Sequence, residues 1–318
     1  MKILFTADIH IKLGQKNVPT EWAQNRYEMM WEAFWELQDK ADMFVIGGDT
    51  FDKLPNMEEL EVFFNLVASC KIPTLIYSGN HEALKKNTTF LTNLKSVVSR
   101  INSDVKIIDD YYSDNGIDII PYNKLKEWEK DPDGAPVGSN SILCTHVRGE
   151  IPPHVKPEVD LSLFDKWDVV LAGDLHSYDN CQRNILYPGS PATTSFHRGF
   201  VDTGVILLDT DTLEHEWIKL DLPQLIRKTI KAGEEALPTE THHTIYEIEG
   251  DLSELSGVAD NDLIDKKIVK RETDTSLILE PDMPLEREVD EYLRYILQLN
   301  DDTIEKCLKE LNAYVNKI

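Results

Sequence analysis

Three classes of protein are excluded by what the sequence lacks. It contains no apolar run near the roughly 18 residues that a transmembrane helix needs, so we expect no contact with a membrane. The N-terminal apolar run 3–5 is too short for the apolar part of a signal peptide, because Asp8 interrupts it, so no secretory signal is expected there. Cysteine is scarce and never occurs as Cys-x-x-Cys, which indicates reduced thiols in a cytoplasmic protein at Cys70, Cys144, Cys181 and Cys307.

Basic residues are also few. The 318 residues include 33 Lys and Arg against 57 Asp and Glu, so the formal net charge is -24. A chain that coats nucleic acid or an anionic membrane by bulk electrostatics carries the opposite balance. Any contact with DNA must therefore be local, or be provided by a metal ion or a partner. The length suits one large domain with an appendage, or two domains, with ample sequence for a buried core.

Short apolar runs separated by amphipathic stretches predict the structure of the first half of the chain. The runs are rich in Val, Ile and Leu and are continuous, which is typical of strands buried on both faces; they cover 2–6, 43–46, 74–77, 142–144 and 169–172. Helical spacing is found around Trp31 and again after Asn56, where Asn56 and Glu59 form a capping box. Alternating strands and helices predict an α/β domain with a largely parallel or mixed sheet.

The rest of the chain has a weaker pattern. Strands are predicted at 117–120, 204–208 and 216–220. Beyond Pro223 the strands are short, at 244–248 and 276–279, and a basic run contains Lys266, Lys267, Lys270 and Arg271, so we interpret this segment as a small α/β appendage. The last 35 residues predict two amphipathic helices, the second capped by Asp302 with Glu305.

Potential metal ligands stand at the ends of the five apolar runs. In chain order they are Asp8 and His10, Asp49, Asn80 and His81, His146, and Asp174 and His176. In an open α/β sheet, ligands bind outside the carboxyl ends of the strands, so these loops are expected to converge on one crevice.

The chemistry of these residues favours a metal-dependent hydrolase. Asp8 and His10 are two residues apart on an extended segment, so both can reach one cation. Gly47-Gly48 allows a sharp turn that brings in Asp49, a carboxylate able to bridge two ions. Imidazole, carboxylate and amide without thiolate favour Mn²⁺ or a similar ion over a structural zinc. Two such ions can activate a water molecule and neutralise charge on a phosphoryl group, which indicates hydrolysis of a phosphate ester.

At these residues the sequence resembles the calcineurin-like metallophosphoesterase superfamily. The ordered motifs are Asp8-Ile9-His10, Gly48-Asp49, Gly79-Asn80-His81-Glu82, Thr145-His146 and Gly173-Asp174-Leu175-His176. Within it, the chain is most similar to SbcD-like DNA double-strand-break repair nucleases. This similarity is carried by GGDTFD at 47–52, IIPY at 119–122 and YPGSP at 187–191, which continues to Ser195-Phe196 and Gly199-Phe200. It covers about residues 1–220.

The resemblance implies a role for each candidate residue. One ion would be held by Asp8, His10 and His176. A second ion would be held by Asn80, His146 and Asp174, and Asp49 would bridge the two. His81 would protonate the leaving oxygen. Lys53, Ser190, His197 and Arg198 are candidate substrate-binding residues. The five histidines outside the ligand motifs are expected at the surface: His154, His197, His215, His242 and His243.

One position departs from the family pattern. The last motif usually reads Gly-His-x-His, and this chain has Asp174 in place of the first histidine. A carboxylate can still coordinate, so we expect a changed metal preference rather than an inactive site.

The resemblance also implies an architecture: an α/β metallophosphoesterase core of mixed β sheets sandwiched by helices, a small α/β capping domain and a C-terminal helical pair. The predicted divisions are 1–222, 223–282 and 283–318, the last of which would bind an ATPase partner. The implied protein is the nuclease subunit of an SbcCD-type complex for DNA end processing, repair and recombination. It would be a homodimer that binds an SbcC-like coiled-coil ATPase. So compact a chain is more similar to bacteriophage members, which would act in the host cytoplasm.

The implied activity is a DNA nuclease, both exonuclease and single-strand endonuclease, that uses two divalent ions, Mn²⁺ or alternatively Mg²⁺. Two alternatives remain open. Asp52-Lys53 resembles the Asp-Arg of phosphatases, so a phosphomonoesterase or cyclic-nucleotide phosphodiesterase of the same superfamily is one. A non-catalytic scaffold on this fold is the other, although such a protein would normally have lost several ligands.

Overall fold

The computed structural model describes residues 1–85, 87–269, 283–297 and 299–315. Lys270, Arg271 and the predicted strand 276–279 lie outside the described residues. Two compact units can be distinguished by their contacts. The first comprises Met1–Ile230, Glu234–Glu247 and Asp260–Lys266, and the second comprises Lys231–Gly233, Ile248–Ala259 and Lys267–Ile318.

A six-stranded sheet forms the centre of the first unit. Its order is β13-β12-β1-β2-β3-β6, where β1, β2, β3 and β6 are parallel and β12 and β13 are antiparallel to their neighbours. The bounds are β1 Lys2–Thr6, β2 Met43–Gly47, β3 Thr74–Tyr77, β6 Val105–Ile108, β12 Gly204–Asp209 and β13 His215–Lys219. The predicted strands of this sheet agree with these bounds within one residue.

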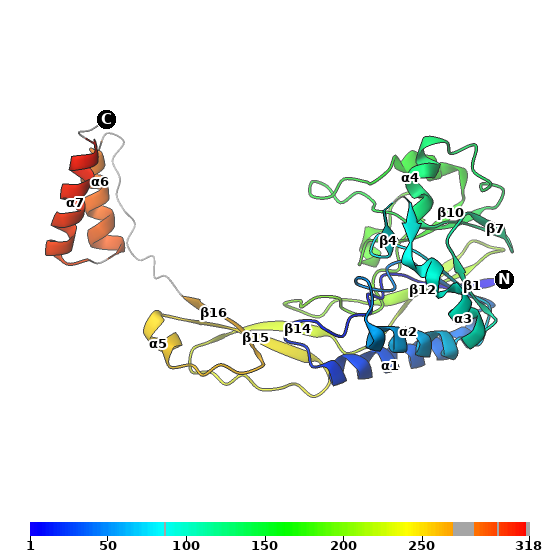
Figure 1. The fold of residues 1–318 in the computed structure, drawn as a ribbon, viewed down its shortest axis with the longest axis horizontal. Helices are drawn as coiled ribbons and strands as arrows, with labels where there is room; N and C mark the ends of the chain where they lie inside the picture. Colours follow the sequence, from blue (N-terminus) through cyan, green and yellow to red (C-terminus); the bar gives the residue numbers. More distant parts are fainter. Residues whose placement is uncertain (86, 270–282, 298, 316–318) are drawn as a thin grey trace. The chain divides into compact units, whose positions relative to one another are not determined.

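Helices cover one face of this sheet. They are α1 (Thr20–Leu37), α2 (Met57–Ser69) and α3 (Lys95–Ile101), which lie side by side in Figure 1. The capping box predicted for α2 is present, with Asn56 Oδ1 accepting from the N–H of Glu59 at 2.8 Å. Leu4 and Ile46 point into the apolar core beneath the helices, whereas the alternate residues Phe5 and Val45 point to the opposite face.

A second sheet packs against that opposite face. Its order is β11-β10-β9-β8-β7, with bounds β7 Tyr112–Asp114, β8 Ile117–Ile120, β9 Ile142–His146, β10 Val169–Gly173 and β11 Ile185–Leu186. Its outer face is covered by α4 (Tyr122–Lys130) and the 3-10 helix η3 (Leu161–Lys166) through Trp128, Phe164 and Trp167. The first unit is therefore two sheets between two helical layers, as predicted, and the ends of β1, β2, β3, β9 and β10 carry the candidate ligands.

Shorter elements connect these layers. A two-stranded ribbon joins β4 (Ala83–Leu84) to β5 (Thr88–Thr89), and the 3-10 helices η1, η2 and η4 span Gln38–Lys40, Phe90–Leu94 and Tyr178–Asn180. A three-stranded sheet has the order β14-β15-β16, with bounds Leu225–Lys231, His243–Gly250 and Ile264–Val269, and α5 spans Leu252–Ser256. The predicted appendage thus contains strands, while the division of the chain at 222 and 282 stays a prediction.

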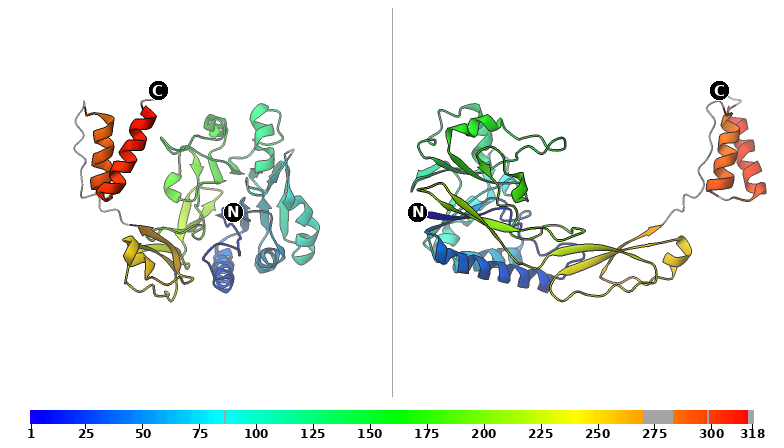
Figure 2. Two further views of the ribbon diagram at one scale, coloured as in Figure 1. Left: turned by 60° about the vertical axis from the view of Figure 1, so that its left-hand side comes forward. Right: turned by 180° about the vertical axis from the view of Figure 1, so that it is seen from behind.

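The second unit contains the helical pair. It consists of α6 (Leu285–Glu291), the π-helical segment η5 (Tyr292–Ile296) and α7 (Asp301–Val315). Figures 1 and 2 show α6 and α7 side by side, and Asn312 Nδ2 donates to Glu286 Oε1 at 2.8 Å. The prediction that Asp302 caps α7 is wrong, because the helix already begins at Asp301. Asn300 acts as the cap instead, since its Oδ1 accepts from the N–H of Thr303 at 3.0 Å.

A second expectation is also wrong. His243 is buried rather than at the surface, because its Nε2 contacts the backbone oxygen of Asn17 at 2.5 Å and Trp22 packs on its ring. Among the described residues, no helix combines the length and the apolar character needed to span a bilayer.

Candidate metal centre

The side chains at the ends of β1 and β2 are positioned by an uncommon backbone. Asp8, His10 and Asp49 have left-handed φ values of 56°, 50° and 48°, which non-glycine residues rarely adopt. Backbone hydrogen bonds join their loops: the N–H of Asp8 donates to Gly48 O at 3.1 Å, and that of His10 donates to Asp49 O at 2.9 Å. Strained backbone persists only where the surrounding structure holds it, and it is concentrated at functional sites.

A buried carboxylate joins these loops to the loop after β3. Glu82 accepts hydrogen bonds from the N–H groups of Asp49 (3.0 Å), Phe51 (2.8 Å) and Gly79 (2.8 Å). The two loops can lie this close together only because residue 79 is glycine, since a Cβ there would collide with the carboxylate of Asp49. Burial and the negative charge of Asp49 raise the pKa of Glu82 to about 7. Glu82 therefore organises the backbone around Asp49, and both of its carboxylate oxygens accept from N–H groups.

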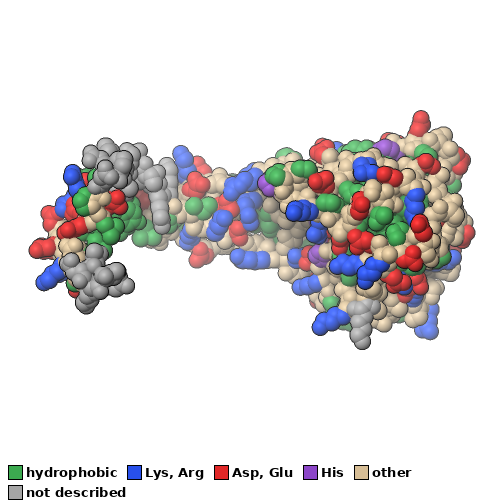
Figure 3. All heavy atoms as spheres, turned by 90° about the horizontal axis from the view of Figure 1, so that it is seen from above, with side chains coloured by type: hydrophobic (Ala, Val, Ile, Leu, Met, Phe, Trp, Pro, Cys, Tyr) green, Lys and Arg blue, Asp and Glu red, His purple; other side chains and the backbone are tan. Residues whose placement is uncertain are grey.

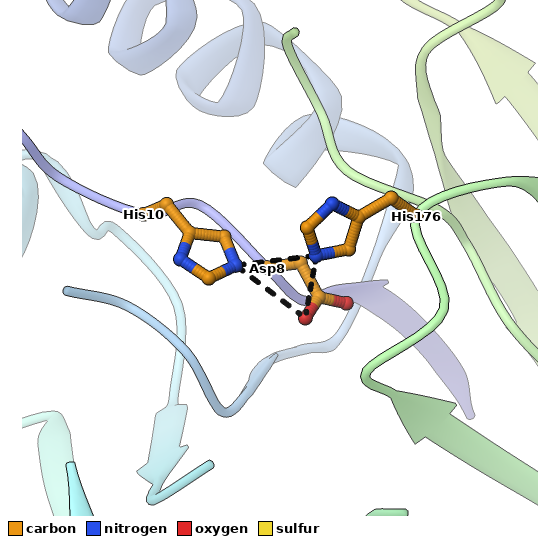
Figure 4. Close-up of side chains that lie close together, drawn as sticks. All are labelled: Asp8, His10 and His176. Carbon is orange, nitrogen blue, oxygen red and sulfur yellow. Dashed lines mark hydrogen bonds and ion pairs between the residues drawn. The ribbon is translucent and has the colours of Figure 1, made fainter. Parts of the chain in front are cut away.

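One group of potential ligand atoms is formed by Asp8, His10 and His176 (Figure 4). Nε2 of His10 lies 3.2 Å from Nε2 of His176, and Oδ1 of Asp8 lies 3.9 Å and 3.6 Å from these two atoms. Asp8 and His10 are buried, whereas the His176 side chain is 42% exposed. Burial lowers the pKa of His10 to about 3 and also lowers that of His176. Two neutral imidazoles and a carboxylate are thus directed at one position, as a divalent cation requires.

Asp49 lies between this group and two further histidines. Its Oδ2 is 3.7 Å from Nε2 of His10, 3.8 Å from Nε2 of His81 and 3.5 Å from Nε2 of His146. Asp49 therefore belongs to two further sets of potential ligand atoms, one with His10 and His81 and the other with Asp8 and His146. Within each set, the atoms lie within 4.8 Å of one another. A carboxylate next to several such sets is where a bridging ligand would stand.

His146 and Asn80 line the other side of the centre. His146 ends β9 and is fully buried; its Nδ1 lies 2.9 Å from Gly47 O and its Nε2 lies 3.1 Å from Oδ1 of Asn80. Burial lowers the pKa of His146, but Asp49, Asp8 and Asp174 together outweigh this and raise it to about 10. Conversely, burial raises the pKa of Asp49, but His146, His10 and the N–H of His81 together outweigh this and lower it.

His81 is oriented by the loop after β2. Its backbone N–H donates to Oδ1 of Asp49 at 2.9 Å, and its ring Nδ1 lies 2.5 Å from the backbone oxygen of Asp52. Because a carbonyl only accepts, Nδ1 carries a hydrogen and Nε2 faces the centre. The side chain is 36% exposed, so it reaches both solvent and the centre.

Asp174, at the end of β10, is held differently. Its N–H donates to both carboxylate oxygens of Asp8 at 3.1 Å. Its own carboxylate accepts from Nε (3.0 Å) and Nη2 (3.3 Å) of Arg148, and its Oδ1 lies 3.9 Å from Nε2 of His146. In the part of the chain that the structure describes, Asp174 belongs to none of the three converging sets of ligand atoms. Its role as a metal ligand stays a prediction.

The donor set fits divalent cations. Oδ1 of Asn80 lies 3.1 Å from Nε2 of His146, and in the opposite amide orientation the nitrogen would donate to Oδ2 of Asp49 at 2.9 Å, so the amide contacts ligand atoms of the centre in either orientation. Nδ1 of His10 is buried with no hydrogen-bond partner among the described residues. Carboxylate, imidazole and amide ligands are typical of sites for divalent cations.

The candidate substrate-binding residues have different surroundings. Ser190 is buried, and its hydroxyl donates to the backbone oxygen of Asp8. Ser190 and His197 line a cavity of about 510 Å³ that also includes His176. Lys53 is exposed, and Arg198 is joined to Glu247 at 2.7 Å. The structure thus brings Ser190 and His197 to a cavity beside His176.

The roles of two residues were not predicted from the sequence. Glu82 belongs to a motif that was identified, and its position next to His81 was the available signal. Arg148 follows His146 by two residues, a spacing that turns two side chains toward the same side of an extended segment. Nothing in the sequence indicated its contact with Asp174.

Comparisons with known proteins agree with this centre. The family model of the calcineurin-like phosphoesterases matches residues 1–178. A protein of Escherichia phage T5 named "Probable exonuclease subunit 1" is 42% identical, with 99% of each chain covered. A protein of Invertebrate iridescent virus 6 described as a phosphoesterase is 26% identical, covering 73% of this chain and 86% of its own length.

Solved structures are more distant. A novel archaeal phosphodiesterase matches with a TM-score of 0.39 and 15% identity over 69% of this chain and 100% of its own. The protein TT1561 of Thermus thermophilus matches with a TM-score of 0.41 and 12% identity, over 69% of this chain and 98% of its own.

Proposed function

The chain belongs to the calcineurin-like phosphoesterase family, and we propose that it is a Mn²⁺-dependent DNA nuclease that hydrolyses phosphodiester bonds. The observation that carries this proposal is the convergence of carboxylate and imidazole side chains from separate strand ends on one centre. Full-length similarity to a protein named as an exonuclease subunit supports DNA as the substrate rather than a phosphomonoester or a cyclic nucleotide. The number of retained ligands supports an enzyme rather than a scaffold.

Three groups of residues would divide the work of metal binding. Asp8, His10 and His176 would hold the first ion, Asn80, His146 and Asp174 the second, and Asp49 would contact both. Two bound ions would supply an activated water and neutralise charge on the phosphoryl oxygens. The 3.2 to 3.9 Å spacings within the first group support this assignment.

His81 would donate a proton to the leaving oxygen. The backbone oxygen of Asp52 orients the ring through Nδ1, so Nε2 is the atom that would face the leaving oxygen. An imidazole can both donate and accept a proton, which suits this task. Because its side chain reaches solvent, water can return the proton after each turnover.

The cavity beside His176 would accept a nucleoside of the substrate. Its lining includes the hydroxyls of Ser190, Thr194 and Ser195 and the exposed ring of Phe200, and none of its described lining residues is Lys or Arg. Such a surface suits the sugar and base rather than the phosphate. Figure 3 shows acidic side chains interspersed with basic ones on the face drawn there, which supports local contacts with DNA rather than a broad basic surface.

The helical pair would bind a partner. We propose that the chain works as a homodimer with an SbcC-like coiled-coil ATPase in DNA end processing, repair and recombination. In the pair, Leu293 and Ile304 are buried, whereas Tyr292 and Leu297 are exposed and available for a helical partner.

Deleting residues 283–318 should leave a Mn²⁺-active nuclease that no longer co-purifies with the ATPase. Retention of the ATPase by the deleted protein would place the interface elsewhere.

A substrate panel tests the activity. Purified protein is incubated with labelled single-stranded DNA, duplex ends, bis(p-nitrophenyl) phosphate and p-nitrophenyl phosphate, with and without Mn²⁺. We expect Mn²⁺-dependent cleavage of both DNA forms and of the small diester. Turnover of the monoester alone would refute the nuclease proposal, and identical residual cleavage by Asp49→Asn would identify a contaminating nuclease.

A further inference from the structure

One guanidinium binds both oxygens of the Asp174 carboxylate. The Asp174 side chain is 6% exposed and that of Arg148 is 47% exposed, so the pair runs from the centre toward solvent. Nε and Nη2 of Arg148 form the two contacts, at 3.0 Å and 3.3 Å. A guanidinium does not lose its proton in proteins. A metal ion that binds Asp174 must therefore compete with a permanent positive charge.

The surrounding charges explain why an arginine is present. The centre already contains the buried carboxylates of Asp8 and Asp49, and the Asp174 N–H is directed at Asp8. A carboxylate at position 174, where the family has an imidazole, adds a third negative charge. Arg148 offsets that charge, and its fork geometry also matches a phosphate group.

We propose that Arg148 exchanges partners during the reaction: it releases Asp174 to the second metal ion and binds a phosphate oxygen of the substrate instead. Each group keeps an opposite charge throughout, because Asp174 passes from arginine to metal and Arg148 passes from carboxylate to phosphate. The second ion and the DNA then bind cooperatively, since each removes the competitor of the other. This inference rests on the proposed nuclease function.

Metal titration of a neutral variant tests the competition. Without DNA, Arg148→Gln should bind the second Mn²⁺ at least about fivefold more tightly than the wild type in isothermal titration calorimetry, because the competing charge is gone. In an Asp174→Ala background the same change should have no effect on metal affinity. A second-ion affinity that is unchanged or lower in Arg148→Gln would overturn the proposal.

DNA binding tests the other half of the exchange. With Ca²⁺ in place of Mn²⁺, the anisotropy of a labelled single-stranded oligonucleotide should show at least about fivefold weaker binding to Arg148→Gln than to the wild type. Arg148→Lys should recover part of the DNA affinity, since the charge returns without the fork. Equal DNA affinity in the wild type and Arg148→Gln would contradict the transfer to phosphate.

A matched control separates this effect from a general loss of surface charge. Arg183 forms a comparable exposed pair with Asp165 outside the centre, with Nη2 at 2.5 Å and 2.7 Å from its oxygens. Arg183→Gln should leave metal and DNA affinity unchanged. A wild type that binds two Mn²⁺ yet cleaves no DNA would refute the proposed function, whereas the calorimetric comparison would still decide whether Arg148 competes for Asp174.

Discussion

The two halves of the centre are held by different kinds of contact. On the six-stranded sheet, Asp8, His10 and Asp49 are set by left-handed backbone and by hydrogen bonds between the backbones of their loops. The buried Glu82 fixes the same loops through three N–H groups. These contacts involve no mobile side chain at the surface.

On the five-stranded sheet, Asp174 also has a positive φ, of 103°, and its N–H donates to Asp8, but other side chains hold the ligand groups themselves. Arg148 holds the carboxylate of Asp174, and Thr194 Oγ1 lies 3.3 Å from Nδ1 of His176. Both Arg148 and His176 are partly exposed. We therefore expect the first half to be preorganised, because its ligands are held by backbone contacts, and we expect Arg148 and His176 in the second half to adjust more readily.

The most severe test of the comparison is Asp49→Asn. Asp49 belongs to the rigid half, and its Oδ2 lies within 3.8 Å of Nε2 of His10, His81 and His146. We expect cleavage to fall by about 10³-fold or more and calorimetry to show weakened binding of both ions. Asp165→Asn, an exposed aspartate outside the centre, is the control. Loss of only one ion would refute the bridging role.

His81→Ala separates chemistry from metal binding within the rigid half. Removing the proposed proton donor should lower cleavage by about 10²- to 10⁴-fold, while Mn²⁺ affinity persists. The measurement is a parallel assay of cleavage and calorimetric Mn²⁺ binding. A collapse of metal affinity would show that His81 is a ligand, as its position in one converging set with His10 and Asp49 allows.

Glu82→Ala tests whether the rigid half depends on backbone order. Three buried N–H groups would lose their acceptor, so we expect the free energy of unfolding to fall by about 3 to 5 kcal/mol, with weakened metal binding. Glu59→Ala is matched to it, because Glu59 is also buried and accepts from two backbone N–H groups, of Leu13 and Asn56. Denaturant unfolding should show a lower free energy of unfolding in both variants, whereas only Glu82→Ala should also lose metal affinity.

Thr194→Val should have the smallest effect. It removes a contact of 3.3 Å with the partly exposed His176, which water can replace. We expect first-ion affinity to fall by no more than about tenfold. A loss of metal affinity as large as that in Glu82→Ala would mean that the second half is also preorganised, and the comparison between the halves would fail.

Much of the fold could be predicted because its signals are local. The strand 74–77 and the capping box of Asn56 with Glu59 depend on residues a few positions apart, and both are present as predicted. The cap of α7 was misplaced because Asn300, Asp302 and Thr303 offer competing local options. His243 was predicted to be exposed because the partner that buries it, Asn17, is distant in the sequence.

The sequence by itself determined which chemical groups stand at the strand ends, since apolar runs closed by Asp, Asn and His require only neighbouring residues. The tertiary structure alone decided how those groups are held. Glu82 reaches the N–H groups of Asp49 and Phe51, and Arg148 reaches Asp174, across 26 to 33 positions of the chain. Contacts over such separations depend on which strands become neighbours in each sheet, and no periodicity within one segment encodes that pairing.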